Sequence, residues 1–403
     1  MSDIRFFEII LKVVERCNLN CSYCYFFNLE DQNYKKHPPF ISMETVRDIV
    51  QFLKRSKTTC PNLTTIRIDL HGGEPMLQPK SQFDAMCTIF REELQNDYQV
   101  EIGMQSNGTL VTESWIELLK KHNVTVGISL DGTKEINDRF RVDHRGKGSY
   151  DKVVAGLRLL QQSGIKAKPG ILSVLNPSYD PALLYHHFVH ELSVQFIDFL
   201  LPDFTHDTFA TSGYSAEDYG AWLCKIFDIW TKEDNPSVQI RFLYTSLSAL
   251  MGYIPALFLG GTPIEGYGAA TISSNGLIGP EDTIRNTDPH IMEELGSVKN
   301  YDISSLMKTP LFTRLGQSLL RIPQECENCC WKSVCRGGKA LNRYSRSEGF
   351  NKPSIYCNGL KMFYEKIASY LLRGGVPDDV LLKSLQINER DSEFFIGHLM
   401  KLA

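Results

Sequence analysis

The sequence predicts an α/β fold with a mainly parallel sheet, and three observations support this prediction. Short apolar segments alternate with longer helix-like segments from residue 6 to about residue 235. The apolar segments are nearly continuous, as in strands that are covered on both faces. A polar segment follows each of the first four, and the segments after the second, third and fourth contain glycine. Strand–helix units in series favour parallel strands with right-handed crossovers, in a barrel-like or an open sheet.

Six strands and six helices are expected in this part of the chain. The strands are rich in β-branched and apolar residues, at Phe7–Val14, Thr65–Leu70, Val100–Met104, Val124–Leu130, Lys166–Val174 and Gln195–Leu200. The helices carry apolar residues at helical spacing, at Met43–Arg55, Gln82–Leu94, Glu113–Lys121, Tyr150–Ser163, Pro181–Glu191 and Ala216–Lys232. For the helix that begins at Tyr150, Ser149 is the expected N-cap and Gly164 follows the expected C-terminus.

The alternation ends near residue 235, and we expect a domain boundary there. A chain of 403 residues is longer than one typical domain. We therefore predict a first domain at residues 1–235 and a second at residues 236–403. In the second, Asn275-Gly276 indicates a hairpin, and a helical tail begins at about Leu360.

The charge balance and the cysteines limit the possible functions. The 43 basic and 47 acidic residues give a net charge of −4, so no basic surplus is available to bind a nucleic-acid backbone. The uncharged stretch Phe242–Ile264 contains Pro255 and several glycines, which favours a buried helix and loop over a membrane span. No signal sequence precedes the first strand, so we expect a cytoplasmic protein whose clustered cysteines are metal or redox ligands.

Three cysteines follow the first predicted strand, with the spacing Cys17-x3-Cys21-x2-Cys24. A structural zinc site has four ligands, whereas three thiolates on one loop suit a four-iron cluster that keeps one iron open. The polar segments after strands two, three and four begin at His71, Gln105 and Ser129. Because the carboxyl ends of parallel strands meet at one edge of a sheet, we expect an active site there.

The segment Cys17-Asn18-Leu19-Asn20-Cys21-Ser22-Tyr23-Cys24-Tyr25 resembles the signature loop of radical S-adenosyl-L-methionine (SAM) enzymes. The resemblance implies a partial (β/α)6 TIM barrel and a [4Fe-4S] cluster whose open iron binds SAM. One-electron reduction of SAM in this family yields a radical that abstracts hydrogen from an unactivated carbon. By the same resemblance, the predicted SAM contacts are Tyr23, Gly72, Gly73, Glu74, Pro75, Gln105, Asn107, Ser129 and Arg141.

A second group of cysteines has the spacing Cys326-x2-Cys329-x5-Cys335, and Cys357 follows. Zinc knuckles would show two close pairs, and only the first pair is close here. The spacing resembles the SPASM extension of radical SAM enzymes that act on peptides, which implies a C-terminal iron–sulfur domain. Members with two auxiliary clusters carry further cysteines, one of them where this chain has Lys339. We therefore predict one auxiliary [4Fe-4S] cluster on the four cysteines, with Cys330 as the alternative to Cys329.

Asp282 is the candidate catalytic residue. It matches an aspartate that acts as general base in the related anaerobic sulfatase-maturing enzymes, although Glu281 stands where those enzymes carry a cysteine. A carboxylate near the substrate would accept the proton that is lost after hydrogen abstraction. The alternative is a solvated loop aspartate beside Glu281.

The resemblance implies a peptide-modifying maturase similar to the Xye-type enzymes that form cyclophanes. Such an enzyme abstracts a Cβ hydrogen from a ribosomal precursor peptide and bonds that carbon to an aromatic ring. Its partners would be this peptide and an electron donor such as flavodoxin or ferredoxin, with no nucleic acid and no membrane. Two alternatives stay open: a formylglycine-forming sulfatase maturase, and an iron–sulfur electron-transfer protein without catalysis.

Overall fold

The computed structural model describes residues 4–29, 31–253, 267–288 and 290–401. These residues fall into two compact units, each built from two stretches of chain. The first unit combines Met1–Ser173 with Pro263–Gln317, and the second combines Val174–Thr262 with Ser318–Ala403. The boundary predicted after residue 235 would divide the chain into two consecutive segments, and it stays a prediction.

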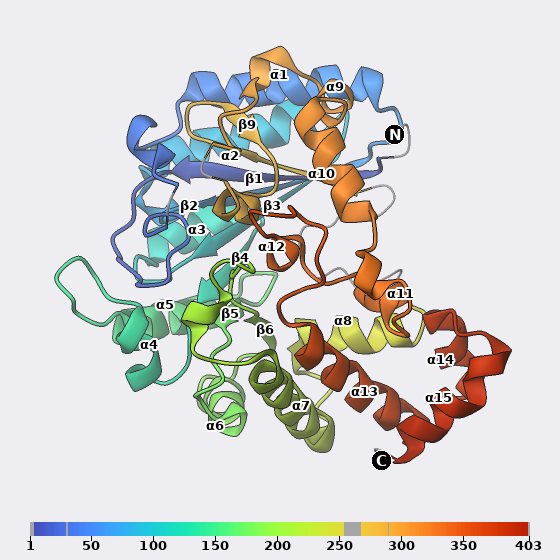
Figure 1. Ribbon diagram of the computed structural model, residues 1–403. Helices are drawn as coiled ribbons and strands as arrows, with labels where there is room; N and C mark the ends of the chain where they lie inside the picture. Colours follow the sequence, from blue (N-terminus) through green and yellow to red (C-terminus); the bar gives the residue numbers. More distant parts are fainter. Residues whose placement is uncertain (1–3, 30, 254–266, 289, 402–403) are drawn as a thin grey trace. The chain divides into compact units, whose positions relative to one another are not determined.

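A mainly parallel sheet forms the centre of the first unit (Figure 1). Its strands lie in the order β10-β9-β8-β1-β2-β3-β4-β5. The five strands from β1 onward are parallel to their neighbours, at Phe6–Val14, Thr65–Gly72, Gln99–Ser106, Val124–Ser129 and Gly170–Val174. The first five predicted strands are thus present. The fifth begins at Gly170 instead of Lys166, and Pro169 before it has no N–H to donate to a ladder.

A strand from late in the chain completes this sheet beside β1. β8 (Tyr267–Ile272) runs parallel to β1 and pairs with it from Phe6 to Leu11. The chain then turns back at Gly276, whose φ is +81°, and forms the predicted hairpin with β9 (Leu277–Gly279). The short β10 (Gly296–Ser297) pairs with β9.

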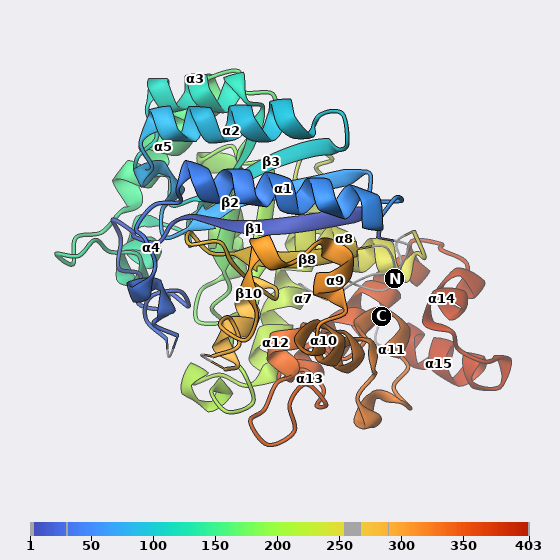
Figure 2. The same ribbon diagram turned by 90° about the horizontal axis from the view of Figure 1, so that it is seen from above.

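Helices cover one face of the sheet. Figure 2 shows α1, α2 and α3 along one side of β1–β3. Along β2, Ile66, Ile68 and Leu70 are fully buried, and the residues that alternate with them, ending at His71, are partly exposed. We call the second face, which carries these polar residues, the inner face. The helices and 3-10 turns of this unit are α1 (Met43–Thr59), α2 (Lys80–Leu94), α3 (Glu113–Lys121), α4 (Lys134–Phe140), α5 (Tyr150–Gln162) and α9 (Ile303–Met307), with turns at Asn33–Lys36, Pro75–Leu77, Asp282–Asn286 and Val298–Asn300.

The start of α5 differs from the prediction in one detail. Ser149 occupies the N-cap position, but its side chain accepts no backbone hydrogen bond from the helix. Its hydroxyl instead donates to the carbonyl of Arg141 at 2.7 Å. Gly164, with a φ of +71°, follows the end of the helix as expected. The hydroxyl of Ser149 therefore supports the segment that carries Arg141.

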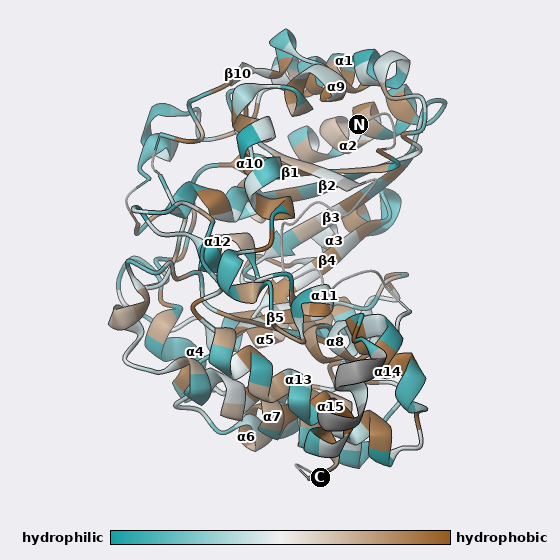
Figure 3. Ribbon diagram, turned by 45° about the vertical axis from the view of Figure 1, so that its right-hand side comes forward, coloured by the Kyte–Doolittle hydropathy of each residue, from teal (hydrophilic) through white to brown (hydrophobic). Residues whose placement is uncertain are grey.

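The second unit contains a short parallel pair of strands and a group of helices. A Cβ on Gly359 of α13 would lie 2.0 Å from the carbonyl oxygen of Ala216 in α7, so glycine permits the close packing of these two helices. Figure 3 shows hydrophilic and hydrophobic residues along both helices, and their apolar residues, such as Phe227 and Phe363, are buried. The elements are β6 (Phe196–Leu200), β7 (Gln239–Ile240), α6 (Pro181–Tyr185) with a π-helical turn at His186–Glu191, α7 (Ala216–Glu233), α8 (Arg241–Leu250), α11 (Lys332–Cys335), α12 (Ala340–Arg343), α13 (Cys357–Arg373), α14 (Asp378–Leu385) and α15 (Glu389–Lys401), with 3-10 turns at Phe209–Ser212 and Gln324–Cys326. α10 (Pro310–Leu320) connects the first unit to this one along the chain.

The uncharged stretch Phe242–Ile264 begins within α8, and its part from residue 254 onward lies outside the described residues. None of the described helices is both long enough and apolar enough to cross a membrane.

Candidate active site

The first three cysteines lie in the loop that follows β1. Its backbone is attached to the segment around the end of α4, because Asn20 N–H donates to the Val142 carbonyl at 2.7 Å and Ser22 N–H donates to that of Phe140 at 3.0 Å. Cys24 N–H donates to the Cys21 carbonyl at 3.0 Å and closes a turn between these two cysteines. The cysteine loop is therefore held in part by the end of α4, a helix that the sequence pattern did not predict.

The surroundings of the three thiols favour binding of a metal. Burial raises the pKa of all three, to about 12 for Cys17. Two groups nonetheless approach the Cys17 sulfur as donors: the Leu19 N–H at 3.4 Å and the Asn107 amide nitrogen at 3.8 Å. Such thiols lose their protons when a metal stabilises the thiolate. The donor set thus fits an iron–sulfur cluster.

A single zinc ion fits this loop less well. With Zn–S bonds of about 2.3 Å, two sulfurs on one ion lie roughly 3.8 Å apart. Among the residues that the structure describes, no three Cys, His, Asp or Glu side chains are arranged to hold one metal ion. A four-iron cluster places a separate iron at each thiolate, so it accepts sulfurs that are farther apart.

Glu74 connects the ends of β2 and β3. Its side chain is fully buried; Oε1 accepts hydrogen bonds from Met76 N–H at 2.9 Å and from the Ser106 hydroxyl at 2.8 Å, and Oε2 accepts one from Asn107 N–H at 2.7 Å. Burial raises the pKa of Glu74, and these three donors oppose that shift. A carboxylate has about four acceptor sites, so one stays available for a ligand such as an amino group.

The two glycines before Glu74 let this segment approach the cysteine loop. Gly72 has a φ of +130°, and a Cβ there would lie 2.0 Å from the carbonyl oxygen of Val14. A Cβ on Gly73 would lie 2.1 Å from the carbonyl oxygen of Arg16. Glu74 N–H donates to that same carbonyl at 3.0 Å, and Pro75 begins the 3-10 turn that follows. The predicted motif is therefore in backbone contact with the chain that leads to Cys17.

Tyr23, Asp131 and Arg141 form one hydrogen-bonded chain. The Tyr23 hydroxyl donates to Asp131 Oδ2 at 2.5 Å and accepts from Arg141 Nη1 at 2.8 Å. Arg141 is 8% exposed, and its Nε has no hydrogen-bond partner among the described residues. This arrangement brings two predicted SAM contacts, Tyr23 and Arg141, together, and leaves a buried N–H that could bind a carboxylate.

Gln105 and Ser129 meet on the inner face of the sheet. The Gln105 amide donates to the Ser129 hydroxyl at 2.8 Å. Gly127 lies between them, and a Cβ there would be 2.3 Å from the Gln105 side-chain oxygen. These two predicted contacts are thus adjacent.

Asp282 is a buried, ion-paired carboxylate. Its Oδ2 accepts hydrogen bonds from the Lys12 ammonium and the Tyr25 hydroxyl, and its Oδ1 lies 3.0 Å from Arg285 Nε. The exposed fractions of the three charged side chains are 4% or less. Burial by itself raises the pKa of Asp282, but Arg285 and Lys12 lower it well below the usual carboxyl range. This carboxylate is charged but weakly basic, so the base role stays a prediction that requires its ion pairs to open.

His71 is the partly exposed member of this group. Its Nδ1 lies 3.1 Å from Lys12 Nζ. An ammonium has no lone pair, so Nδ1 accepts and the ring proton is on Nε2. Burial and the Lys12 charge lower the pKa of His71 to about 4, which keeps the ring neutral at pH 7. His71 therefore presents a neutral N–H donor on the inner face.

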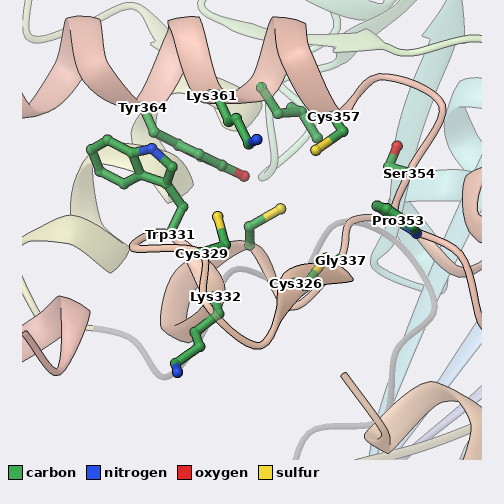
Figure 4. Close-up of a pocket in the computed structure, with 12 residues that line it drawn as sticks. Cys326, Cys329, Trp331, Lys332, Gly337, Pro353, Ser354, Cys357, Lys361 and Tyr364 are labelled. Carbon is green, nitrogen blue, oxygen red and sulfur yellow. The ribbon is translucent and has the colours of Figure 1, made fainter. Parts of the chain in front are cut away.

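The four predicted auxiliary-cluster cysteines line one pocket of the second unit. In Figure 4 the sulfurs of Cys326, Cys329 and Cys357 point toward a common space, and Cys335 also lines it. The space between the lining residues is about 320 Å³ when the part open to solvent is included. Burial raises the pKa of Cys335 to about 12 and that of Cys326 to about 11. Four convergent thiols fit a cluster that has no open iron.

Cys330 lies outside this lining. It is exposed, whereas the neighbouring Cys329 faces the pocket. A hydrogen bond from the Cys330 thiol lowers the pKa of Cys329 to about 6. The geometry therefore favours Cys329 as the ligand and Cys330 as a neighbour that stabilises its thiolate.

Comparison with known proteins relates the part of the chain that holds the first of these two sites to a known superfamily. A family model for the radical SAM superfamily matches residues 11–181, the segment that contains the first cysteine loop and the Glu74 segment. This part of the chain is similar to radical SAM enzymes. The cofactors predicted for it, a [4Fe-4S] cluster and SAM, are those of this superfamily, and the second cysteine group suits an auxiliary cluster.

Curated relatives match this chain over most of its length. A cysteine-type anaerobic sulfatase-maturating enzyme from Clostridium novyi is 28% identical over 373 residues, which covers 90% of this chain and 95% of the relative. A serine-type anaerobic sulfatase-maturating enzyme from Bacteroides thetaiotaomicron is 27% identical over 385 residues, covering 88% of this chain and 87% of the relative.

Solved structures show the same fold. Native anSMEcpe with bound AdoMet and a peptide is similar over 91% of this chain and 98% of that chain, with a TM-score of 0.76 and 23% identity. SuiB from Streptococcus suis, bound to S-adenosylmethionine, covers 88% of this chain and 75% of that chain, with a TM-score of 0.58 and 17% identity. The predicted fold class, a partial barrel with a C-terminal extension, is confirmed.

Sequence reasoning missed several residues of the site. Lys12 left a visible signal, since it and Glu8 are the only charged residues in a strand that is apolar elsewhere. His71 also left a signal: it is the last of the polar residues that alternate with apolar ones along β2, and it directly precedes Gly72 and Gly73. Tyr25 and Arg285 left no such signal, because only the fold brings them to Asp282.

Proposed function

We propose that this radical SAM protein abstracts a Cβ hydrogen from a side chain of a peptide substrate and oxidises that residue. The observation that carries the proposal is the pairing of a three-thiol loop with the buried Glu74 carboxylate, with a separate four-thiol pocket in the same chain. When bound, the cluster and SAM supply a radical that takes hydrogen from an unactivated carbon. The protein's own residues orient SAM and the substrate.

Each predicted SAM contact has a task in this proposal. Glu74 offers its remaining acceptor site to the amino group of SAM, and Arg141 offers Nε to its carboxylate. Gln105 and Ser129 offer polar groups to the ribose region from the inner face. An external one-electron donor such as flavodoxin or ferredoxin would reduce the cluster.

The first candidate product is a cyclophane crosslink in a ribosomal precursor peptide. Lys339 favours it, since members with two auxiliary clusters carry a cysteine at this position. Here the Lys339 ammonium lies 2.6 Å from Asp203 Oδ1, so the position is used for an ion pair. The SAM-derived radical would take a hydrogen atom from the peptide, and closing the ring would then release a proton and an electron, the electron to an oxidised auxiliary cluster. The proton would pass to Asp282 or to a group that its ion pairs position.

The second candidate product is formylglycine. The sulfatase-maturating relatives favour it, because they match this chain over nearly its whole length. Formylglycine also requires removal of a Cβ hydrogen, from Cys or Ser. The two candidates therefore share the first step and differ in what happens to the carbon afterwards.

One assay separates the candidates. The protein is reconstituted anaerobically with iron and sulfide, then given dithionite, SAM and either a sulfatase-derived peptide with a target cysteine or a peptide encoded beside the gene. Release of 5′-deoxyadenosine with loss of two hydrogens from the encoded peptide supports the crosslink. Conversion of the target cysteine to an aldehyde supports formylglycine. A protein that holds both clusters but releases no 5′-deoxyadenosine would be an electron-transfer protein.

A further inference from the structure

Arg343 is a buried cation without an acidic partner. It ends α12, and its residue is 1% exposed. Its guanidinium donates to four backbone carbonyls: those of Phe350 (3.1 Å), Leu319 (3.3 Å), Ser318 (3.1 Å) and Arg321 (2.8 Å). No carboxylate among the described residues forms an ion pair with it. Burial of an uncompensated charge is costly, so an anion is expected nearby.

The anion that suits Arg343 would be a cluster in the second cysteine pocket. The sulfurs of Cys326 and Cys335, both of which line that pocket, are the groups whose charge would act on its guanidinium. A Cβ on Gly337, which also lines the pocket, would lie 3.5 Å from Arg343 Nε. The guanidinium is therefore directly behind the pocket wall.

The hydroxyl of Tyr364 is a second polar group at this pocket that lacks a partner. It is buried, and it has no hydrogen-bond acceptor among the described residues. Figure 4 shows it pointing into the space between the cysteine sulfurs. A phenol hydroxyl that faces sulfur atoms can donate its proton to one of them in a hydrogen bond. A sulfur of a bound cluster would be its acceptor.

We propose that Arg343 and Tyr364 are positioning residues for the auxiliary cluster, the first as its buried counter-charge and the second as a hydrogen-bond donor, and that both raise its reduction potential. A four-thiolate cluster carries a net negative charge, and one-electron reduction adds one more negative charge. A buried positive charge and a hydrogen bond to sulfur both stabilise the more negative state. The inference rests on the proposed auxiliary cluster.

The alternative is that Arg343 only holds the chain together. Ser318 and Leu319 belong to the last turn of α10, whose free carbonyls attract a cation. The charge-conserving variant Arg343→Lys and the neutral variant Arg343→Gln separate the two roles. If only the hydrogen bonds to carbonyls matter, both variants should lose fold stability. The reduction potential of the cluster should then not differ between the charged and the neutral variant.

The test is an EPR-monitored redox titration of the full-length protein in a Cys21→Ala background, which isolates the auxiliary signal. In Arg343→Gln we expect the equilibrium constant for cluster reduction to fall about tenfold, or about 59 mV for one electron. Arg343→Lys should keep most of the wild-type potential, and Tyr364→Phe should lower it by a smaller amount. Lys366→Gln is the control, since Lys366 lies on α13 like Tyr364 but does not line the pocket, and its ammonium pairs with Asp228 Oδ1 at 2.7 Å.

Unchanged potentials in Arg343→Gln and Tyr364→Phe, with iron content and EPR lineshape intact, would overturn the inference. If Arg343→Gln does not retain its cluster, the potentials of Arg343→Lys and Tyr364→Phe test the inference instead. The inference would also fail if the parent protein bound no auxiliary iron. In that case the proposed cluster itself would be absent, and an iron assay of the parent protein would show this directly.

Discussion

Lys12 and Asp282 neutralise each other in a part of the molecule that excludes water. Each is acceptable only because the other is present, with Arg285 and Tyr25 completing the group. Removal of one partner from a buried pair leaves the other charge uncompensated. At this position, effects on stability and effects on chemistry must therefore be measured separately.

Asp282→Ala should lower the free energy of unfolding by about 3–5 kcal/mol, because the Lys12 and Arg285 charges lose their carboxylate. Asp282→Asn should cost less, since the amide oxygen still accepts a hydrogen bond. Urea unfolding measures both. The control is Asp151→Ala, whose carboxylate is 73% exposed and pairs with Lys134 at the surface, where about 0–1 kcal/mol is expected. Equal costs for Asp282→Ala and Asp151→Ala would contradict the burial argument.

His71 should make stability depend on pH between about pH 4 and pH 6.5. Its pKa in the folded chain is about 4, against about 6.5 when unfolded, so the unfolded chain binds more protons in this window. Stability then falls as the pH is lowered from 6.5 to 4, by at most about 1.4 kcal/mol per pH unit. His71→Gln should remove this slope.

Urea unfolding at several pH values measures the slope. His290→Gln is the control, since its side chain is 83% exposed. A slope that persists in His71→Gln and disappears in His290→Gln would contradict the assignment.

The candidate site was partly predictable at the scale of single residues. Cysteine spacing predicted Cys17 as a cluster ligand, and the resemblance to a known family added Glu74 and Arg141 as expected SAM contacts. The partners of Asp282 could not be predicted, since Lys12, Tyr25 and Asp282 come from three separate segments. Whether a carboxylate is a free base or an ion pair depends on what the fold places around it.

At the scale of elements, local patterns determined most of the first unit. The apolar runs and helical periodicities located β1–β5 and four of the helices of this unit. Each such pattern arises because one face of a single element is buried. α4 was missed because its seven residues are too few to show a period. The position of β8 beside β1 was not predictable, since pairing between distant segments leaves no local signal.

Gly73→Ala should disrupt the contact between the end of β2 and the cysteine loop. The new methyl group would lie 2.1 Å from the Arg16 carbonyl oxygen and 2.8 Å from the Phe27 ring, and the carbonyl belongs to backbone that cannot simply rotate away. We expect at least a tenfold loss in SAM affinity, since a displacement of this segment costs about 1.4 kcal/mol or more. Equilibrium dialysis with labelled SAM measures it.

Gly316→Ala is the matched control for this change. Gly316 lies in α10, and a Cβ there meets no atom within 4 Å. Alanine should stabilise the helix by about 0.5–1 kcal/mol and leave SAM affinity unchanged. Equal SAM affinities in the two variants would mean that the Gly73 contact has no role in binding.

At the scale of the whole molecule, the two cysteine groups belong to different compact units. Each unit has its own buried residues, so loss of one metal site leaves the other's ligands in place. The sequence indicated two groups, but their assignment to units depends on which distant segments pack together.

Cys21→Ala and Cys335→Ala should each remove about half of the iron, because each takes away one ligand of one four-iron cluster. Cys21→Ala should abolish SAM cleavage, whereas Cys335→Ala should keep SAM binding. Cys87→Ala, at a buried cysteine in α2, is the control and should keep all the iron. Colorimetric iron determination with EPR checks this. Unchanged iron in Cys335→Ala would exclude Cys335 as a ligand.

The pairing of β8 with β1 has a consequence for biosynthesis. The first strand emerges from the ribosome roughly 260 residues before its edge partner. Until then one edge of the nascent sheet is uncovered, and such edges associate with other chains. Nascent chains halted before residue 267 should therefore depend on chaperones, and those halted after β9 should resist proteolysis near their N-terminus.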